Sequence, residues 1–92
     1  MIDFRVGLGY DSHRLIKKDD NDSKPFVLAG IEIPHYKRCV AHSDGDVLLH
    51  SLCDALLGAA ALRDIGTHFP DTDPKYKDID SQILTREVAE MV

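Results

Sequence analysis

Hydrophobic and polar positions divide the chain into segments of different period. From Phe4 to Tyr10, apolar side chains alternate with Arg or Gly, and this period of two is typical of a β-strand. Two short apolar runs, Phe26–Leu28 and Ile31–Ile33, flank Ala29-Gly30, which predicts a β-hairpin. The polar run Lys17–Lys24 lies between these segments and predicts a solvated loop.

The strongest helical pattern runs from Ser43 to about Leu62. Ser43 and Asp46 are spaced as an N-terminal capping pair, just before the apolar residues begin. Apolar residues then recur at steps of three and four, which predicts a helix with one face in the core. The predicted core-facing residues are Leu48, Leu52, Ala55, Leu56, Ala59 and Leu62.

A second helix is predicted to begin near Asp80 or Ser81. Its apolar stripe is formed by Leu84, Val88 and Met91. The pattern reaches the last residue without a Gly, a Pro or a basic ending, so we expect a chain truncated after the second long helix.

The order of these elements predicts an α+β fold, a two-layer α/β sandwich in which helices pack on a mixed β-sheet. The chain has 92 residues, which is enough for one small domain, residues 1–92, expected to be incomplete. A composition that is 43% hydrophobic and 29% charged is that of a folded domain and argues against disorder.

Charge and hydropathy exclude several classes of partner. The net charge is -5, and no basic stripe runs along the chain, so neither nucleic acid nor an anionic membrane is an expected partner. No apolar run approaches the roughly 20 residues of a membrane-spanning helix. Cys39 and Cys53 are too few for a disulfide framework and are expected to be reduced thiols. We therefore expect a cytoplasmic protein, or one in an organelle matrix such as the plastid.

A candidate metal site begins at the end of the first predicted strand. Asp11 and His13 are two residues apart and share one strand face, the face that Gly7 and Gly9 leave open. Catalytic zinc takes Asp oxygen and His nitrogen, usually from three residues, and keeps a position open. His50 on the long helix is the best third ligand. The alternative is that His50 forms an ordinary surface pair or lies in the core.

The surroundings of His50 suggest two further roles. Asp46 and Asp54 lie one helical turn on either side of it, so either carboxylate is a candidate partner for its second ring nitrogen. His42 and Ser43 precede the helix, where backbone N–H groups favour an anion such as phosphate. Alternatively, Ser43 is only a cap and His42 only a loop residue.

The segment Phe69–Pro74 reads FPDTDP and predicts a turn-rich loop. Asp71 and Asp73 within it are candidates to contact sugar hydroxyls or a metal, and the alternative is a solvated turn. His35 and His68 have no partner at ligand spacing and receive no role.

Three segments together resemble a known enzyme family. Gly7–His13 (GLGYDSH), Ala41–Gly66 (AHSDGDVLLHSLCDALLGAAALRDIG) and Phe69–Pro74 look like 2-C-methyl-D-erythritol 2,4-cyclodiphosphate synthase. The resemblance runs over essentially the whole chain but covers only the N-terminal part of the family's usual sequence. It implies a phosphorus–oxygen lyase of the methylerythritol phosphate route to isoprenoids. The substrate would be 4-diphosphocytidyl-2-C-methyl-D-erythritol 2-phosphate, whose 2-phosphate attacks the β-phosphorus, so that the products are CMP and 2-C-methyl-D-erythritol 2,4-cyclodiphosphate.

The same resemblance implies roles for particular residues. Asp11, His13 and His50 match the family's metal ligands, with Zn²⁺ the favoured ion. His42 matches a position that stabilises the transition state, and with Ser43 it matches a phosphate-contacting pair. The implied substrate contacts are Asp11, His13, His42, Ser43, Asp64, Ile65, Gly66, Phe69, Pro70, Asp71, Thr72 and Asp73.

The resemblance also implies features that this chain alone does not supply. A second divalent ion, Mg²⁺ or Mn²⁺, and the cytidine pocket belong to a later segment of the family, which is absent here. The full-length parent would be a homotrimer with active sites between subunits. We therefore expect that the 92-residue chain alone folds poorly or does not turn over the substrate. The alternative functions are a zinc-dependent phosphoester hydrolase and an inactive metal-binding fragment, in which the ion only ties strand to helix.

Overall fold

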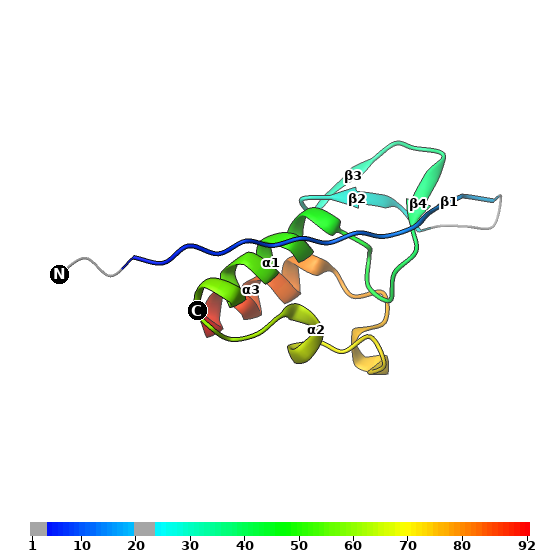
Figure 1. The fold of residues 1–92 in the computed structure, drawn as a ribbon. Helices are drawn as coiled ribbons and strands as arrows, with labels where there is room; N and C mark the ends of the chain where they lie inside the picture. The colour runs from blue at the N-terminus through cyan, green and yellow to red at the C-terminus, as the bar shows by residue number, and fades with distance from the viewer. Residues whose placement is uncertain (1–3, 20–23) are drawn as a thin grey trace.

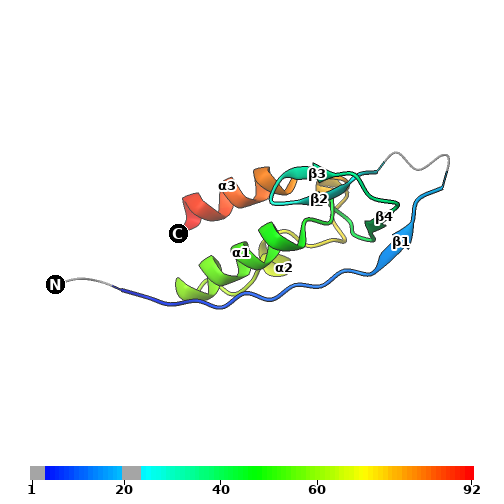
Figure 2. The same cartoon turned by 90° about the horizontal axis from the view of Figure 1, so that it is seen from above.

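The computed structural model describes residues 4–19 and 24–92. Figure 2 shows α1 between α3 and the N-terminal segment, and in both ribbon views the short strands gather near the N-terminal end of α1 (Figures 1 and 2). The α+β class predicted from the sequence is confirmed. The elements are β1 (Leu15–Lys17), β2 (Phe26–Leu28), β3 (Ile31–Ile33), β4 (Lys37–Cys39), α1 (Val47–Ala59), α2 (Ile65–His68), the 3-10 helix η1 (Pro74–Tyr76) and α3 (Ser81–Met91).

The strands of the described residues pair in two separate two-stranded antiparallel sheets. β2 pairs with β3, with Phe26 opposite Ile33, so the predicted hairpin is confirmed. β1 pairs with β4, with Leu15 opposite Cys39. Each strand has three residues, and the described pairings do not join into the single mixed sheet that the sequence predicted. The predicted loop Lys17–Lys24 is shorter at its start, because β1 includes its first residue, and residues 20–23 lie outside the described part of the chain.

The predicted strand Phe4–Tyr10 is not a strand in the structure, because none of the described strands pairs with it. We call residues 4–13 the N-terminal arm. It runs along α1, with Gly7 and Gly9 against the helix backbone (Figure 2). A Cβ atom on Gly9 would stand only 1.7 Å from the carbonyl oxygen of Ser51. The close approach that the glycines predicted is therefore confirmed, and α1 is what approaches them. The apolar residues of the arm are exposed, namely Phe4, Val6, Leu8 and Tyr10.

Helix α1 is shorter than the sequence predicted. It begins at Val47, and the carboxylate of Asp46 caps it by accepting a hydrogen bond from the backbone N–H of Leu49 at 3.0 Å. The predicted first cap, Ser43, lies before the helix instead. The predicted end at Leu62 is also wrong, because positive backbone φ angles at Ala61 and Arg63 (57° and 73°) are incompatible with a continuing α-helix.

The core lies between α1 and α3. The stripe predicted on α1 is wrong at Leu48 and Leu52, whose side chains are 47% and 42% exposed. The arm takes the α1 face where the backbone of Ser51 and Ala55 meets its glycines, so another face of the helix turns toward α3. On α3 the prediction is confirmed for the first two stripe residues but not for Met91, which is exposed. The buried cluster consists of Cys53, Leu57, Phe69, Leu84 and Val88.

No helix among the described residues is long and apolar enough to cross a membrane. Both cysteines are free, as the sequence predicted. Burial raises the pKa of both Cys39 and Cys53, which keeps each thiol protonated to a higher pH than an exposed cysteine.

Candidate metal centre

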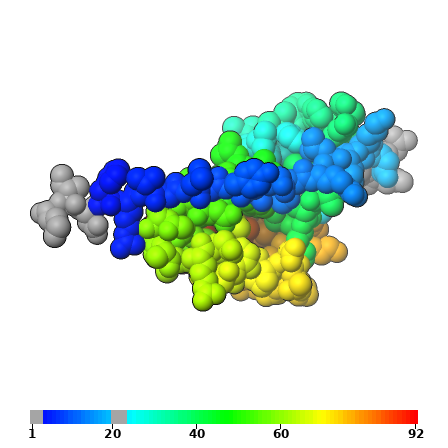
Figure 3. Space-filling model, viewed as in Figure 1, coloured from blue at the N-terminus to red at the C-terminus, as the bar shows by residue number. Residues whose placement is uncertain are grey.

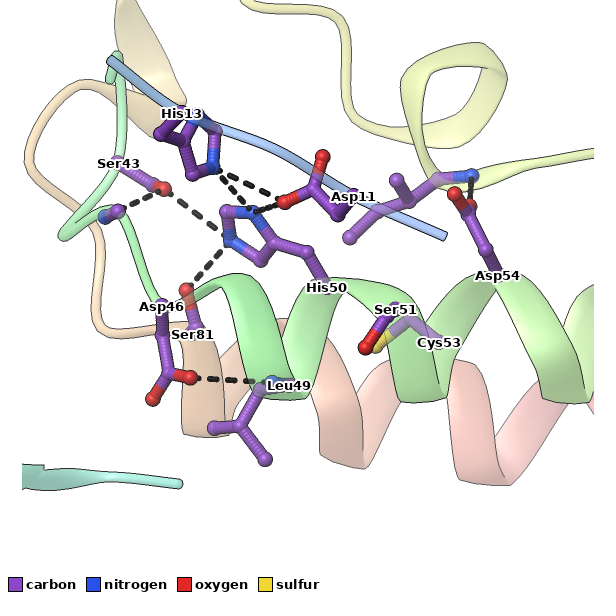
Figure 4. A network of polar contacts seen from close by, with 12 residues as sticks. Asp11, His13, Ser43, Asp46, Leu49, His50, Ser51, Cys53, Asp54 and Ser81 are labelled. Carbon is purple, nitrogen blue, oxygen red and sulfur yellow. Dashed lines mark hydrogen bonds and ion pairs between the residues drawn. The ribbon is translucent and has the colours of Figure 1, made fainter. Parts of the chain in front are cut away.

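Three side chains from distant parts of the sequence meet at the start of α1. Asp11 and His13 come from the end of the arm, and His50 comes from the first turn of α1 (Figure 4). The Asp11 Oδ2 atom lies 3.0 Å from His13 Nε2 and 3.2 Å from His50 Nδ1. The two ring nitrogens lie 3.2 Å apart. The meeting of arm and helix that the sequence predicted is therefore confirmed.

The spacing of these atoms fits a small divalent cation. Ligand atoms about 2.0–2.1 Å from a tetrahedral ion stand roughly 3.4 Å from one another, slightly farther apart than these three. Asp11 Oδ2, His13 Nε2 and His50 Nδ1 are the kinds of atom that bind zinc through O and N. Within the described residues, this is the group of three His, Cys, Asp or Glu side chains that brings its ligand atoms within 4.8 Å of one another.

The arm fixes the distance between the ligands. Figure 3 shows it as a ridge along one side of the molecule, bordered by the residues that follow α1. Its glycines let the backbone lie against α1, and that contact brings Asp11 and His13 over the first turn of the helix. The glycines and the two ligands of this motif therefore act together, because the glycines allow the close contact with α1 that brings Asp11 and His13 near His50.

The predicted partners of the second His50 ring nitrogen are wrong, because both carboxylates are engaged elsewhere. Asp46 is fully buried and accepts hydrogen bonds from the backbone N–H groups of Ala29 (3.0 Å) and Gly30 (2.7 Å) in the hairpin turn. Asp54 accepts one from the N–H of Ile65 at 2.8 Å, at the start of α2. Each acid therefore ties α1 to a neighbouring element.

Two serines contact His50 Nε2 instead. The Ser81 hydroxyl oxygen is 2.7 Å away, and the Ser43 hydroxyl oxygen is 3.2 Å away. Ser81 is the first residue of α3 and has no exposed surface. Sequence reasoning missed it, because a serine at the start of a helix usually signals only a helix end.

A cavity of about 480 Å³ opens beside the three ligands. His42 and Ser43 line it, and His42 Nε2 lies 2.8 Å from the carbonyl oxygen of Asp73. The sequence did not predict part of the cavity wall, because the residues there are mostly apolar and form no recognisable binding motif. The lining residues predicted as substrate contacts are Asp11, His13, His42, Ser43, Ile65, Gly66, Phe69, Pro70, Asp71 and Thr72, and the residues not predicted are Val40, Ala41, Tyr76, Ile79 and Leu84.

Asp64 and Asp73 do not line this cavity; they cap the short helices around it. Asp64 accepts hydrogen bonds from both the N–H and the hydroxyl of Thr67 at 2.8 Å, and these bonds hold the pKa of Asp64 below its usual value. Asp73 accepts a hydrogen bond from the N–H of Lys75 at 3.0 Å. Substrate contact by either carboxylate stays a prediction.

Comparison with known proteins finds one family that matches nearly the whole chain. Residues 4–92 match the model of the YgbB family. The chain is 56% identical over 88 residues to the 2-C-methyl-D-erythritol 2,4-cyclodiphosphate synthase of Salinibacter ruber, covering 96% of this chain and 53% of the relative. It is 60% identical over 89 residues to that of Methylococcus capsulatus, covering 97% and 53%.

The fold is also shared with a solved structure. The CDP-bound form of a 2C-methyl-D-erythritol-2,4-cyclodiphosphate synthase superposes with a TM-score of 0.80 at 45% identity, covering 95% of this chain and 55% of that one. This chain spans about half the length of the curated relatives it matches.

Proposed function

The chain belongs to the YgbB family, and from that premise we propose that it carries the metal and phosphate part of a 2-C-methyl-D-erythritol 2,4-cyclodiphosphate synthase active site. The substrate would be 4-diphosphocytidyl-2-C-methyl-D-erythritol 2-phosphate, and the products would be the cyclic diphosphate and CMP. The convergence of Asp11, His13 and His50 on one point beside the cavity is the observation that carries the proposal.

In this proposal the three ligands hold Zn²⁺. The chemistry that zinc would supply there is neutralisation of phosphate charge and polarisation of the phosphorus that is attacked. Asp11, His13 and His50 would supply three ligand atoms, which would leave room for a substrate phosphate oxygen. Because both the attacking group and its target are anionic, the main task of these residues is to fix the two groups in line.

His42 and Ser43 would bind phosphate through their side chains. The N-terminus of α1 does not supply this binding alone, because the carboxylate of Asp46 already accepts the N–H of Leu49 there. Both proposed donors line the cavity next to His50. His42 would stabilise the negative charge that grows in the transition state, and Ser43 would orient the same phosphate.

Two loops would hold the rest of the substrate. Ile65 and Gly66 line one wall of the cavity, and residues 69–72 line another. The caps formed by Asp64 and Asp73 stabilise the short helices that carry these loops. The second divalent ion (Mg²⁺ or Mn²⁺), the homotrimer of the full-length parent, and a location in the cytoplasm or an organelle matrix are proposals that come from the family resemblance.

Removal of His50 tests the metal site. We expect the wild-type chain to bind one Zn²⁺, and His50→Ala to bind it at least about 100-fold more weakly, because only two ligands remain. Isothermal titration with Zn²⁺ measures both affinities. The matched control is His35→Ala, since His35 is exposed, accepts a hydrogen bond from the N–H of Lys37 and is not one of the three ligands. Unchanged zinc affinity in His50→Ala would contradict the ligand assignment.

Product analysis separates the alternative functions. When substrate and Zn²⁺ are given to a protein with the complete active site, the synthase hypothesis predicts the release of CMP and a cyclic diphosphate. Inorganic phosphate without a cyclic product would indicate a phosphoester hydrolase. If the metal only ties the arm to the helix, His50→Ala would lose its folded circular dichroism spectrum, whereas the catalytic reading predicts a folded variant that has lost zinc.

A further inference from the structure

A line of hydrogen bonds runs from His50 away from the other two ligands. His50 Nε2 lies 2.7 Å from the hydroxyl oxygen of Ser81 (Figure 4). That hydroxyl donates to Asp44 Oδ1 at 2.5 Å, and the backbone N–H of Ser81 donates to Asp44 Oδ2 at 2.9 Å. Neither Ser81 nor Asp44 was a site candidate in the sequence.

The chemistry of these groups fixes the direction of each bond. An ionised carboxylate only accepts, so the single hydroxyl hydrogen of Ser81 goes to Asp44. The Ser81 oxygen can then only accept from His50, which places the His50 proton on Nε2. The other neighbour of Nε2, the hydroxyl of Ser43, is farther away at 3.2 Å.

This arrangement leaves the lone pair of neutral His50 on Nδ1. Nδ1 is the ring nitrogen that faces Asp11 Oδ2 and His13 Nε2, each 3.2 Å away. Nδ1 need not donate to the Asp11 carboxylate, because His13 Nε2 lies closer to Asp11 Oδ2, at 3.0 Å, and can supply that hydrogen. A metal ligand needs its lone pair on the nitrogen that faces the ion, and a hydrogen bond to the opposite nitrogen also holds the plane of the ring.

We propose that Ser81 and Asp44 are positioning residues of the metal site. The Ser81 hydroxyl oxygen accepts a hydrogen bond from the Nε2–H of His50, and Asp44 takes the hydroxyl hydrogen, so that Ser81 cannot donate to His50. This inference deepens the proposed function and rests on the metal site described there. The geometry of the metal site would then depend on how the two helices pack, because Ser81 begins α3 and His50 belongs to α1.

A purely structural role of Ser81 has to be separated from this one. The same residues hold α3 in place, since Asp44 binds the backbone N–H of Ser81 and its own N–H donates to the carbonyl oxygen of Ile79 at 3.1 Å. Loss of stability alone would therefore not support the proposal. The informative measurements are the proton position on His50 and the affinity for Zn²⁺.

The first experiment is ¹⁵N nuclear magnetic resonance of the histidine rings in the metal-free wild-type chain at neutral to mildly alkaline pH. His50→Ala assigns the His50 signals by their disappearance. We expect neutral His50 to carry its proton on Nε2. A proton on Nδ1 overturns the proposal, whatever any variant does.

The second experiment measures Zn²⁺ affinity in Ser81→Ala and Ser81→Thr. The alanine variant loses the acceptor, so we expect binding 10- to 100-fold weaker together with a mixture of His50 tautomers. The threonine variant keeps the hydroxyl and should recover most of the affinity. Thr85→Val is the matched control in the same helix, because Thr85 donates to the carbonyl oxygen of Ser81 and does not contact His50.

These outcomes distinguish this inference from the proposed function. Wild-type affinity and an unchanged His50 tautomer in folded Ser81→Ala would overturn the positioning role while leaving the metal site intact. A wild-type chain that binds no Zn²⁺ would overturn the proposed function. The ¹⁵N measurement would still show which ring nitrogen of His50 carries the proton.

Discussion

Gly9→Ala is expected to lower zinc affinity by about 100-fold, close to 3 kcal/mol of binding free energy. A Cβ atom at this position would stand 1.7 Å from the carbonyl oxygen of Ser51 and 2.8 Å from the backbone nitrogen of Ala55. These are backbone atoms of α1 that cannot move aside, so the arm has to lift. Asp11 and His13 then move away from His50. Zinc affinity falls, because the ligands of a metal site must be held within about 0.5 Å of the productive geometry. Zinc titration of the purified variant gives the affinity.

Gly58→Ala is the matched control for this prediction. Gly58 is an exposed residue of α1, and a Cβ there would meet nothing within 4 Å. Alanine is favoured over glycine inside a helix, so we expect stability to rise by up to about 1 kcal/mol and zinc affinity to stay unchanged. Wild-type zinc affinity in Gly9→Ala would show that the contact between arm and helix does not set the ligand geometry.

Asp46→Ala is expected to lower the free energy of unfolding by about 3 kcal/mol. The fully buried carboxylate caps α1 and also accepts the N–H groups of Ala29 and Gly30. Alanine would remove the cap and leave the hairpin N–H groups without an acceptor. Urea denaturation followed by circular dichroism measures the change.

Asp80→Ala provides the comparison for that value. Asp80 is an exposed N-cap of α3 whose carboxylate accepts a hydrogen bond from the N–H of Gln82 at 2.9 Å. Its removal is expected to cost about 1 kcal/mol, as for an ordinary cap. Equal losses in the two variants would mean that Asp46 acts only as a cap and does not hold the hairpin.

Local patterns predicted the elements that local chemistry decides. The hairpin at Phe26–Leu28 and Ile31–Ile33 and the start of α3 are confirmed. The strand at Phe4–Tyr10 is wrong, because a strand is defined by its partner and none of the described strands pairs with this segment. The alternation nevertheless correctly indicated that the segment has two different faces. The glycines of one face lie against α1, and the apolar side chains of the other face are exposed.

The candidate site shows the same division. The sequence predicted that Asp11, His13 and His50 meet, and the family resemblance implied the same set; the structure brings their ligand atoms together. The partner of the second His50 ring nitrogen could not be predicted this way, because Ser81 reaches it only through the packing of α3 on α1. The family resemblance is confirmed by the match over residues 4–92.

Anomalous X-ray diffraction at the zinc edge, on crystals grown with Zn²⁺, shows directly whether one zinc ion binds between the arm and α1. We expect one strong peak about 2.0–2.2 Å from Asp11 Oδ2, His13 Nε2 and His50 Nδ1. A peak at other residues, or one that His50 does not touch while its ring points away from the arm, would contradict it.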